Sequence, residues 1–251
     1  MKEEIAPYTL PAEAQAQLMG LAAEADQLVL GEIHGTQEVP RLLLGLREPL
    51  AERGYRGLAL EIPCDQREPI LDWAQGRTEA IPAFFQPGEV RDGRESAQSL
   101  SLLRQMTGGP GGWRLLCFDR GNDQPYEDWA GRDATMAANL VAQWQQLCPD
   151  GKVVAVCGNL HSRVALSSDP EDPFRALWPS FAFDVQRLLP EKRVRSVNIV
   201  FHGGTFYNET ERTFASSPLE AGAEIRPSRR GDHTLELHLP HATAVTFLDR
   251  S

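Results

Sequence analysis

The sequence predicts an α/β protein built on a parallel sheet. Short apolar runs that stop at glycine, proline or a polar residue alternate with longer segments of helical spacing, which indicates strands alternating with helices. The clearest unit spans residues 27–62, and a strand–helix–strand unit of this kind implies two parallel strands joined by a right-handed crossover. A chain of 251 residues, 41% of them hydrophobic, can bury the core of one large α/β domain or two small ones.

The regular elements follow from apolar spacing and from the residues that interrupt it. The helix expected over 36–53 carries its leucines on one face, with Thr36 as its expected cap and Gly54 at its end. The full set expected, in chain order, is a helix over 11–25, a strand over 27–31, a helix over 36–53, a strand over 57–62, helices over 67–76 and 96–107, a strand over 113–118, a helix over 130–147, and strands over 152–157 and 194–202.

Three stretches are expected to be less regular. Prolines and glycines break every pattern over 77–94, which predicts a lid-like loop anchored by the aromatic pair Phe84 and Phe85. A Pro/Asp-rich loop over 167–173 leads into an irregular segment that precedes the strand at 194. Residues 208–233 are polar and predict a long loop.

The last residues predict a pair of strands. Apolar and polar side chains alternate over 234–239 and again over 244–248, and the sequence PHAT joins the two runs. His233, His238 and His241 lie in this polar C-terminal region and are expected to face solvent.

Composition excludes several classes of function. The formal net charge of −10 argues against a nucleic-acid partner, which normally binds to a basic face. The four cysteines have no spacing typical of a structural zinc site or a disulfide framework. No apolar run approaches the roughly 18 residues of a membrane span. We therefore expect a soluble, cytoplasmic protein with no nucleic-acid or membrane partner.

Polar side chains stand at the end of each predicted strand. Because the carboxyl ends of parallel strands share one edge of the sheet, where ligands bind in α/β proteins, these side chains are expected to converge in one functional crevice. They are Glu32 and His34 after the first strand, Glu61 at the second, Asp119 and Arg120 after the third, Asn159 and His161 after the fourth, and His202 at the fifth.

Such a set supports two kinds of chemistry. A histidine beside a carboxylate can act as a general base that takes a proton from water, while an arginine or a second histidine stabilises the oxyanion. The same histidines and carboxylates could instead hold a divalent metal that polarises a carbonyl. The chain has no GxSxG elbow and no glycine-rich phosphate loop, and Ser162 is the one, weak candidate for a covalent nucleophile.

Four motifs occur in an order that resembles a known superfamily. They are GEIHGTQE at 31–38, LALEIP at 58–63, RDATMAANL at 132–140 and VCGNLH at 156–161. Together they resemble the erythromycin esterase-like and ChaN-like superfamily, which includes the TraB/Tiki-type proteins. The resemblance extends from about residue 27 to residue 206, with GGTF at 203–206 as its weaker end.

The resemblance implies a three-layer α/β/α fold with a mostly parallel sheet and a cleft at the strand ends. It favours a single domain over residues 1–251, with a family-like core over 27–206 and a polar loop and strand pair over 207–251. In the esterase-like members the histidine of the GExHGT motif is the base that activates water, a role that His34 would take. Arg132 would anchor substrate or form a structural ion pair.

The resulting hypothesis is an esterase-like hydrolase that cleaves an ester or amide bond in a small molecule or a peptide. The expected catalytic residues are His34, Glu32, Glu61 and His161, and the expected substrate-binding residues are Arg120, Asp119, Asn159, Arg132 and His202. Because Tiki-type members are metal-dependent peptidases, the four catalytic residues would also be the ligands of a divalent metal such as Mn, Co or Zn. The chain is shorter than a typical macrolide esterase, so a macrolide substrate is not expected. The alternative is a haem- or metal-binding protein of the ChaN-like type without catalysis.

Overall fold

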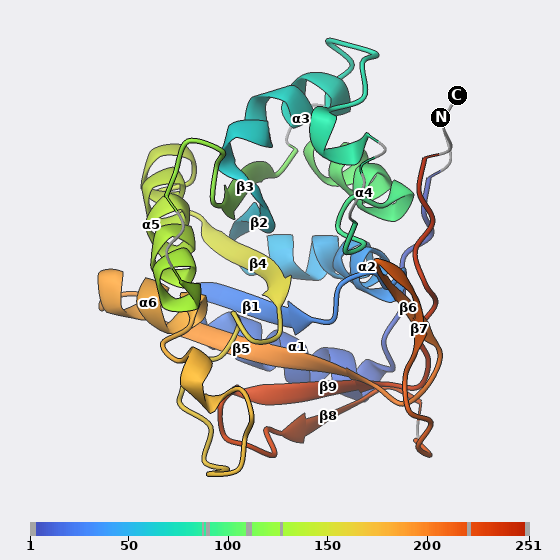
Figure 1. The fold of residues 1–251 in the computed structure, drawn as a ribbon, viewed down its shortest axis with the longest axis vertical. Helices are drawn as coiled ribbons and strands as arrows, with labels where there is room; N and C mark the ends of the chain where they lie inside the picture. The colour runs from blue at the N-terminus through green and yellow to red at the C-terminus, as the bar shows by residue number, and fades with distance from the viewer. Residues whose placement is uncertain are drawn as a thin grey trace.

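A seven-stranded sheet forms the centre of the protein (Figure 1). The computed structural model describes residues 4–86, 88, 91–108, 112–125, 128–219 and 222–248. The strands of the sheet lie in the order β3-β2-β4-β1-β5-β9-β8, and every neighbouring pair is parallel except β8 with β9. Their bounds are β1 Gln27–Glu32, β2 Tyr55–Pro63, β3 Arg114–Asp119, β4 Lys152–Gly158, β5 Val194–Phe201, β8 Glu224–Pro227 and β9 Leu235–Leu239. A separate hairpin pairs β6 Thr205–Asn208 with β7 Thr210–Thr213.

Helices cover both faces of the sheet, which confirms the three-layer α/β/α fold with a mostly parallel sheet. One core cluster packs α1 Ala12–Glu24, α2 Glu38–Ala51, α3 Arg67–Ala74 and α4 Ala97–Thr107 against one face. The other packs α5 Trp129–Leu147 and α6 Phe181–Leu188 against the opposite face, where Figure 1 shows the two helices together. Short 3-10 turns lie at Cys64–Gln66, Ala83–Phe85 and Arg175–Leu177.

Strand alternation explains how the two cores are built. In β1, Leu28 and Leu30 belong to the first cluster while Val29, between them, belongs to the second. All three side chains are fully buried, as expected for a central strand with helices on both faces. Among the described residues, no helix is long and apolar enough to span a membrane.

The helices and strands expected up to residue 202 are confirmed, with ends shifted by a few residues, but the cap of α2 is not. Gln37 precedes α2, and its side chain makes no capping bond. Thr36 instead forms an isolated β-bridge with Ala244, and its hydroxyl has no hydrogen-bond partner among the described residues. The backbone near the start of α2 is therefore hydrogen-bonded to the C-terminal segment, through Thr243 and Ala244, and not to a capping side chain.

The expectations for the last third of the chain need four corrections. The segment before β5, predicted as irregular, contains helix α6, capped by the Ser180 side chain. The polar stretch 208–233 contains β7 and β8. Residues 244–248 form no strand, so the predicted terminal pair does not exist, and β9 joins the main sheet between β5 and β8. His233 and His238 are buried.

The segment predicted as a lid-like loop is partly described. Phe85 is buried, and Phe84 packs edge-to-face against it with ring centroids 5.1 Å apart, so the aromatic anchor lies against the first core. Residues 87, 89 and 90 lie outside the described residues. The end of this segment carries Arg94 into the site described below.

The turn after β1 is held by segments from the far end of the chain. Gly35 has φ of +85°, and its carbonyl oxygen accepts hydrogen bonds from the backbone N–H groups of Tyr207 and Val245, each at 3.0 Å. A Cβ atom on Gly35 would stand 1.9 Å from the carbonyl oxygen of Tyr207, which is backbone and cannot turn away. Only glycine fits this position, so the strand-end turn and β6 are packed as one unit.

This packing predicts that Gly35→Ala is strongly destabilising. Gly54 is the matched control, because its φ of +87° is similar while its Cβ would meet nothing within 4 Å. Gly54→Ala should cost only the left-handed backbone strain of about 1–2 kcal/mol. Gly35→Ala adds a backbone clash and should lower the free energy of unfolding by clearly more, as measured by urea denaturation. Equal losses in the two variants would contradict the packing argument.

Candidate active site

Glu61 is the centre of a polar cluster at the carboxyl ends of the strands. Its side chain is 3% exposed. Oε2 accepts a hydrogen bond from the Gly158 N–H at 2.7 Å and lies 3.5 Å from His34 Nε2. Oε1 accepts from Arg132 Nη2 at 2.8 Å and from Arg94 Nη1 at 3.3 Å. Burial acts to raise the pKa of Glu61, but the surrounding basic side chains outweigh burial and hold the pKa well below its usual value.

His34 lies between two carboxylates. Its Nδ1 is 3.0 Å from Glu32 Oε1, and its Nε2 faces Glu61. Burial acts to lower the pKa of His34, but the charge of Glu61 and the hydrogen bonds to both carboxylates raise it to about 10. His34 is therefore an imidazolium at neutral pH, and it can donate a proton or a hydrogen bond but cannot accept one.

Two guanidinium groups bridge Glu61 to Asp119 at the end of β3. Arg94 Nη1 donates to Asp119 Oδ2 at 3.1 Å and to the Glu61 carbonyl oxygen at 2.7 Å, while its Nη2 pairs with Asp92 at 2.8 Å. Arg132, near the start of α5, donates to both oxygens of Asp119, at 3.1 and 2.8 Å. Each buried carboxylate is thus matched by positive charge and directed hydrogen bonds, which an ionised group in this environment requires.

His161 has a fixed tautomer. Its Nδ1 lies 2.5 Å from Asp133 Oδ1, and the other oxygen of that fully buried carboxylate accepts the Phe181 N–H at 2.8 Å. Its Nε2 lies 3.1 Å from Arg132 Nη1. Because arginine only donates, the hydrogen-bond network assigns the proton to Nδ1 and leaves the Nε2 lone pair directed into the site. Trp129 stacks on the imidazole ring, with centroids 4.5 Å apart and planes 2° apart.

The structure brings most of the predicted site residues together, and places three elsewhere. Arg120 lies in the loop after β3 and donates to the Gln124 carbonyl oxygen. The side chain of Asn159 lines a separate groove. His202 is hydrogen-bonded to His238, with 2.8 Å between Nε2 and Nδ1. The predicted residues that do converge are Glu32, His34, Glu61, Asp119, Arg132 and His161.

Three contributors were missed from the sequence. Arg94 lies in the glycine- and proline-rich segment that predicts only a loop, so no periodicity marks it. Asp133 follows Arg132 directly in the motif RDATMAANL, and Arg132 was already predicted to lie at the site. This neighbouring position is the sequence signal that could have identified Asp133 as a partner of His161. Trp129 opens the same helix, and no motif in the sequence marks it as part of the site.

Ser162 forms part of a Ser–His–Asp arrangement outside this cluster. Its Oγ lies 2.8 Å from His233 Nε2, and His233 Nδ1 lies 2.9 Å from Asp232 Oδ1. The serine is fully buried, and a Cβ on Gly31 would stand 2.0 Å from its Oγ, so backbone closes one side of the hydroxyl. A nucleophile must be able to reach its substrate, and this buried hydroxyl cannot. The hydrogen bonds among Ser162, His233 and Asp232 therefore have a structural role, because they connect the loop that carries His161 to the residues before β9.

The arrangement of donors does not fit a metal ion. Within the described ranges, no group of three or more His, Cys, Asp or Glu side chains is placed to hold one. Both nitrogens of His34 face carboxylates, and Nε2 of His161 faces a guanidinium, where a cation would be repelled. The expectation of a bound metal or haem therefore gains no support from the geometry of these donors.

A small cavity adjoins the cluster. Its volume is about 40 Å³, more than the roughly 15 Å³ that one water needs. Glu32, His34, Glu61 and Arg94 form its polar wall, and apolar side chains of α2, β2 and α4 form the rest. Space beside the charged groups is thus limited to a water or a small chemical group.

Comparison with solved structures identifies the fold. No family model matches the chain, and no curated protein matches it in sequence. An erythromycin esterase, EreC, solved as a mutant in its open conformation, superposes with a TM-score of 0.65 at 11% identity, covering 97% of both chains. The chain has the erythromycin esterase-like fold. A succinoglycan biosynthesis protein gives 0.68 at 10% identity over 97% of this chain and 95% of that one, and a Bacillus cereus protein gives 0.64 at 11% identity over 93% and 92%.

These likenesses confirm the predicted fold. Sequence identities of 10–11% carry no information on substrate or on individual residues. The shared fold places the ligand-binding edge at the carboxyl ends of the parallel strands, which is where the Glu61 cluster lies.

The raised pKa of His34 predicts a pH dependence of stability. The folded-state value of about 10 lies above the ordinary value of 6.5, so the stabilisation is fully present below pH 6.5 and is lost as the pH rises through about 10. The free energy of unfolding should therefore fall between pH 7 and pH 10, and fall less in His34→Asn. His241→Asn, at an exposed histidine, is the control and should follow the unsubstituted protein. A fall of the same size in His34→Asn would contradict this assignment.

Proposed function

We propose that the protein is a hydrolase that directs water onto an ester or amide carbonyl at the Glu61 cluster. The observation that carries the proposal is the Asp133–His161 pair, because it presents an unprotonated Nε2 beside Glu61 and Arg132. An imidazole oriented by a buried carboxylate is a general base in many hydrolases. The fold shared with an erythromycin esterase supports a reaction of this class.

The two histidines take different roles in this proposal. The resemblance to the esterases implies His34 as the base, but a histidine with a pKa of about 10 already holds its proton at neutral pH. His161 Nε2 carries a lone pair that accepts a hydrogen bond from Arg132 Nη1, and Glu61 Oε1 lies 3.7 Å from it. We therefore assign the base to His161 and a proton-donating, charge-stabilising role to His34.

Hydrolysis by this site would proceed as follows. A water takes the place of Arg132 Nη1 at His161 Nε2, and its oxygen attacks the carbonyl carbon as Nε2 accepts its proton. The carbonyl oxygen becomes negative and is stabilised by the imidazolium of His34 and the guanidinium of Arg132. The carbon–oxygen or carbon–nitrogen bond then breaks, and His161 returns the proton to the leaving alcohol or amine.

The remaining charged groups keep the catalytic ones in place. Glu61 holds both histidines and both arginines through its two oxygens. Asp119 fixes Arg132 through two hydrogen bonds, so the guanidinium is positioned before substrate arrives. Once the water has displaced Nη1 from His161, Asp119 and Glu61 still hold the guanidinium, and charge fixed in this way lowers the barrier to oxyanion formation.

Activity measurements distinguish the two histidines. On a panel of p-nitrophenyl esters and anilides, starting from acetyl compounds because the cavity beside His34 is small, His161→Asn and Asp133→Asn should lower kcat by about 10²–10⁴-fold. His161→Asn should also lose the acidic limb of the pH–rate profile, which should persist in His34→Asn with a reduced rate.

The exposed His241→Asn is the matched control and should retain full activity, and thermal melting monitors the fold of every variant. Loss of the acidic limb in His34→Asn, with retention in His161→Asn, would return the base to His34. Turnover unchanged in both variants would overturn the proposed site.

The same geometry predicts that activity survives chelation. Protein purified without chelator should contain no manganese, cobalt, zinc or iron near one atom per chain, because the histidine nitrogens are already engaged. Dialysis against a chelator should leave turnover unchanged. Near-stoichiometric metal that falls in both His34→Ala and His161→Ala, or a Soret band lost in His161→Ala, would instead support the metal- or haem-binding alternative.

A further inference from the structure

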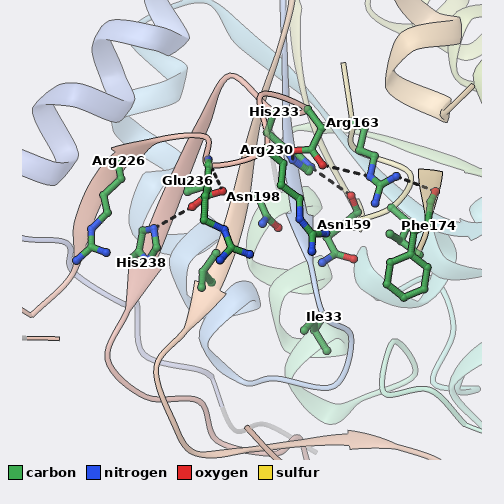
Figure 2. Close-up of a pocket in the computed structure, with 14 residues that line it drawn as sticks. Ile33, Asn159, Arg163, Phe174, Asn198, Arg226, Arg230, His233, Glu236 and His238 are labelled. Carbon is green, nitrogen blue, oxygen red and sulfur yellow. Dashed lines mark hydrogen bonds and ion pairs between the residues drawn. The ribbon is translucent and has the colours of Figure 1, made fainter. Parts of the chain in front are cut away.

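A groove of about 610 Å³ lies on the sheet over β5 and β9, beside the proposed site but separate from it (Figure 2). It starts at Ile33, between Glu32 and His34, and at Asn159, in the loop that carries His161. Its volume falls within the roughly 300–1,000 Å³ of sites that bind small organic ligands. The proposed hydrolysis uses none of the side chains that form its floor.

The floor of the groove is a polar sheet face. Asn198 on β5 and Glu236 and His238 on β9 point into it, while their neighbours Ile199 and Leu237 belong to the core on the opposite face. His238 is 6% exposed although it lies on a face without a covering helix. Polar side chains on a strand face that borders solvent are usually exposed. The low exposure of His238 shows that this face is enclosed by its surroundings and lines a groove.

The acidic groups of the groove are already paired inside the protein. Asp232 binds His233 at 2.9 Å and Arg163 at 3.5 Å, and its pKa is lowered to about 2 because these contacts outweigh burial. Glu236 accepts the Arg229 backbone N–H at 2.9 Å and lies 3.2 Å from His238 Nε2. Asp232 is thus matched by the charge of Arg163. Glu236 has a backbone N–H and a histidine whose pKa is lowered by burial as partners, so it keeps its negative charge, and the acidic group of a ligand is expected on the arginines and away from Glu236.

The basic groups retain hydrogen-bond donors. Arg230 pairs with Asp172 through Nη1 at 3.2 Å, but its buried Nε has no hydrogen-bond partner within the described ranges. The exposed guanidinium of Arg229 has no hydrogen bond or ion pair to any described side chain. Arg226 uses Nη2 on Glu224 and keeps its other donors. The three arginines line the groove, so positive charge is concentrated there. This differs from the chain as a whole, whose formal net charge is −10.

Apolar side chains complete the groove. Phe174, 44% exposed, stands at one end, and Leu160, Val200 and Ile33 line the wall next to the His161 loop. An exposed phenylalanine can pack against a ring or an apolar chain, and arginines bind carboxylate and phosphate groups. Figure 2 shows Phe174 and Arg226 at opposite ends of the same groove.

We propose that this groove binds an organic anion, with its carboxylate or phosphate on Arg226, Arg229 and Arg230 and its apolar body toward Phe174. The inference does not rest on the proposed hydrolysis, because binding can be measured without turnover. The ligand's hydrogen-bond donors would reach Asn198 Oδ1, a buried acceptor without a partner among the described residues.

Calorimetric titration of the full chain with three naphthalene compounds tests the proposal. 1-Naphthyl phosphate or 1-naphthoate should bind at least about tenfold more tightly than 1-naphthol, because only the two anions can form charge-assisted hydrogen bonds to the arginines. The compound that binds more tightly distinguishes a phosphate from a carboxylate ligand. The double substitution Arg226→Gln with Arg229→Gln should remove the preference for the anion and leave naphthol binding unchanged.

Two further variants keep the result interpretable. Arg212→Gln removes one arginine charge from the exposed strand β7, outside the groove, and should retain the preference. Asn198→Asp keeps the side-chain shape but adds negative charge to the floor, and should weaken the binding of both anions relative to that of naphthol. Equal binding of all three compounds to the unsubstituted protein, or an anion preference that survives the double substitution, would overturn the proposal.

Discussion

The ionised carboxylate of Glu61 is the group on which the rest of the site depends. A charge buried to this degree is stable only with compensating charge and directed hydrogen bonds, and here these come from four parts of the chain. The β1 turn supplies His34, the β4 end supplies the Gly158 N–H, α5 supplies Arg132, and the segment before α4 supplies Arg94. The carboxyl ends of β1, β2 and β4 must therefore lie side by side at the same edge of the sheet, so that their side chains and backbone can all reach Glu61.

The backbone around this cluster leaves little room for adjustment. A Cβ on Gly158 would lie 3.3 Å from His34 Nε2 and 3.4 Å from His161 Cδ2, so the strand passes directly beneath both imidazoles. Gly93 is equally confined, since its Cβ would lie 2.2 Å from the Gly35 Cα. The glycines next to the strand ends are thus explained by close backbone approach as well as by turn formation. They let the polar side chains come within hydrogen-bonding distance of one another.

Much of this could be predicted from the sequence, for a physical reason. Strand ends in a parallel sheet share an edge, so Glu32, Glu61, Asp119 and His161 could be placed together from strand positions alone. Arg94 could not, because its position depends on tertiary contacts of a segment without periodicity. The stretch from 208 to 233 was interpreted as a loop because β8 is short and polar on the face that borders the groove, and polar strands at a sheet edge resemble loops in sequence.

The histidines show why position alone does not assign a catalytic role. Both His34 and His161 follow a central strand, and both approach Glu61. The second partner of each ring makes the difference. His34 has a carboxylate on either nitrogen, so the protonated form is stabilised twice. His161 has a carboxylate on Nδ1 and a guanidinium on Nε2, so the hydrogen-bond network places the proton on Nδ1 and leaves Nε2 as an acceptor. In the proposed mechanism His161 is therefore the base because of Asp133 and Arg132, two neighbouring residues of α5 that lie behind the strand ends.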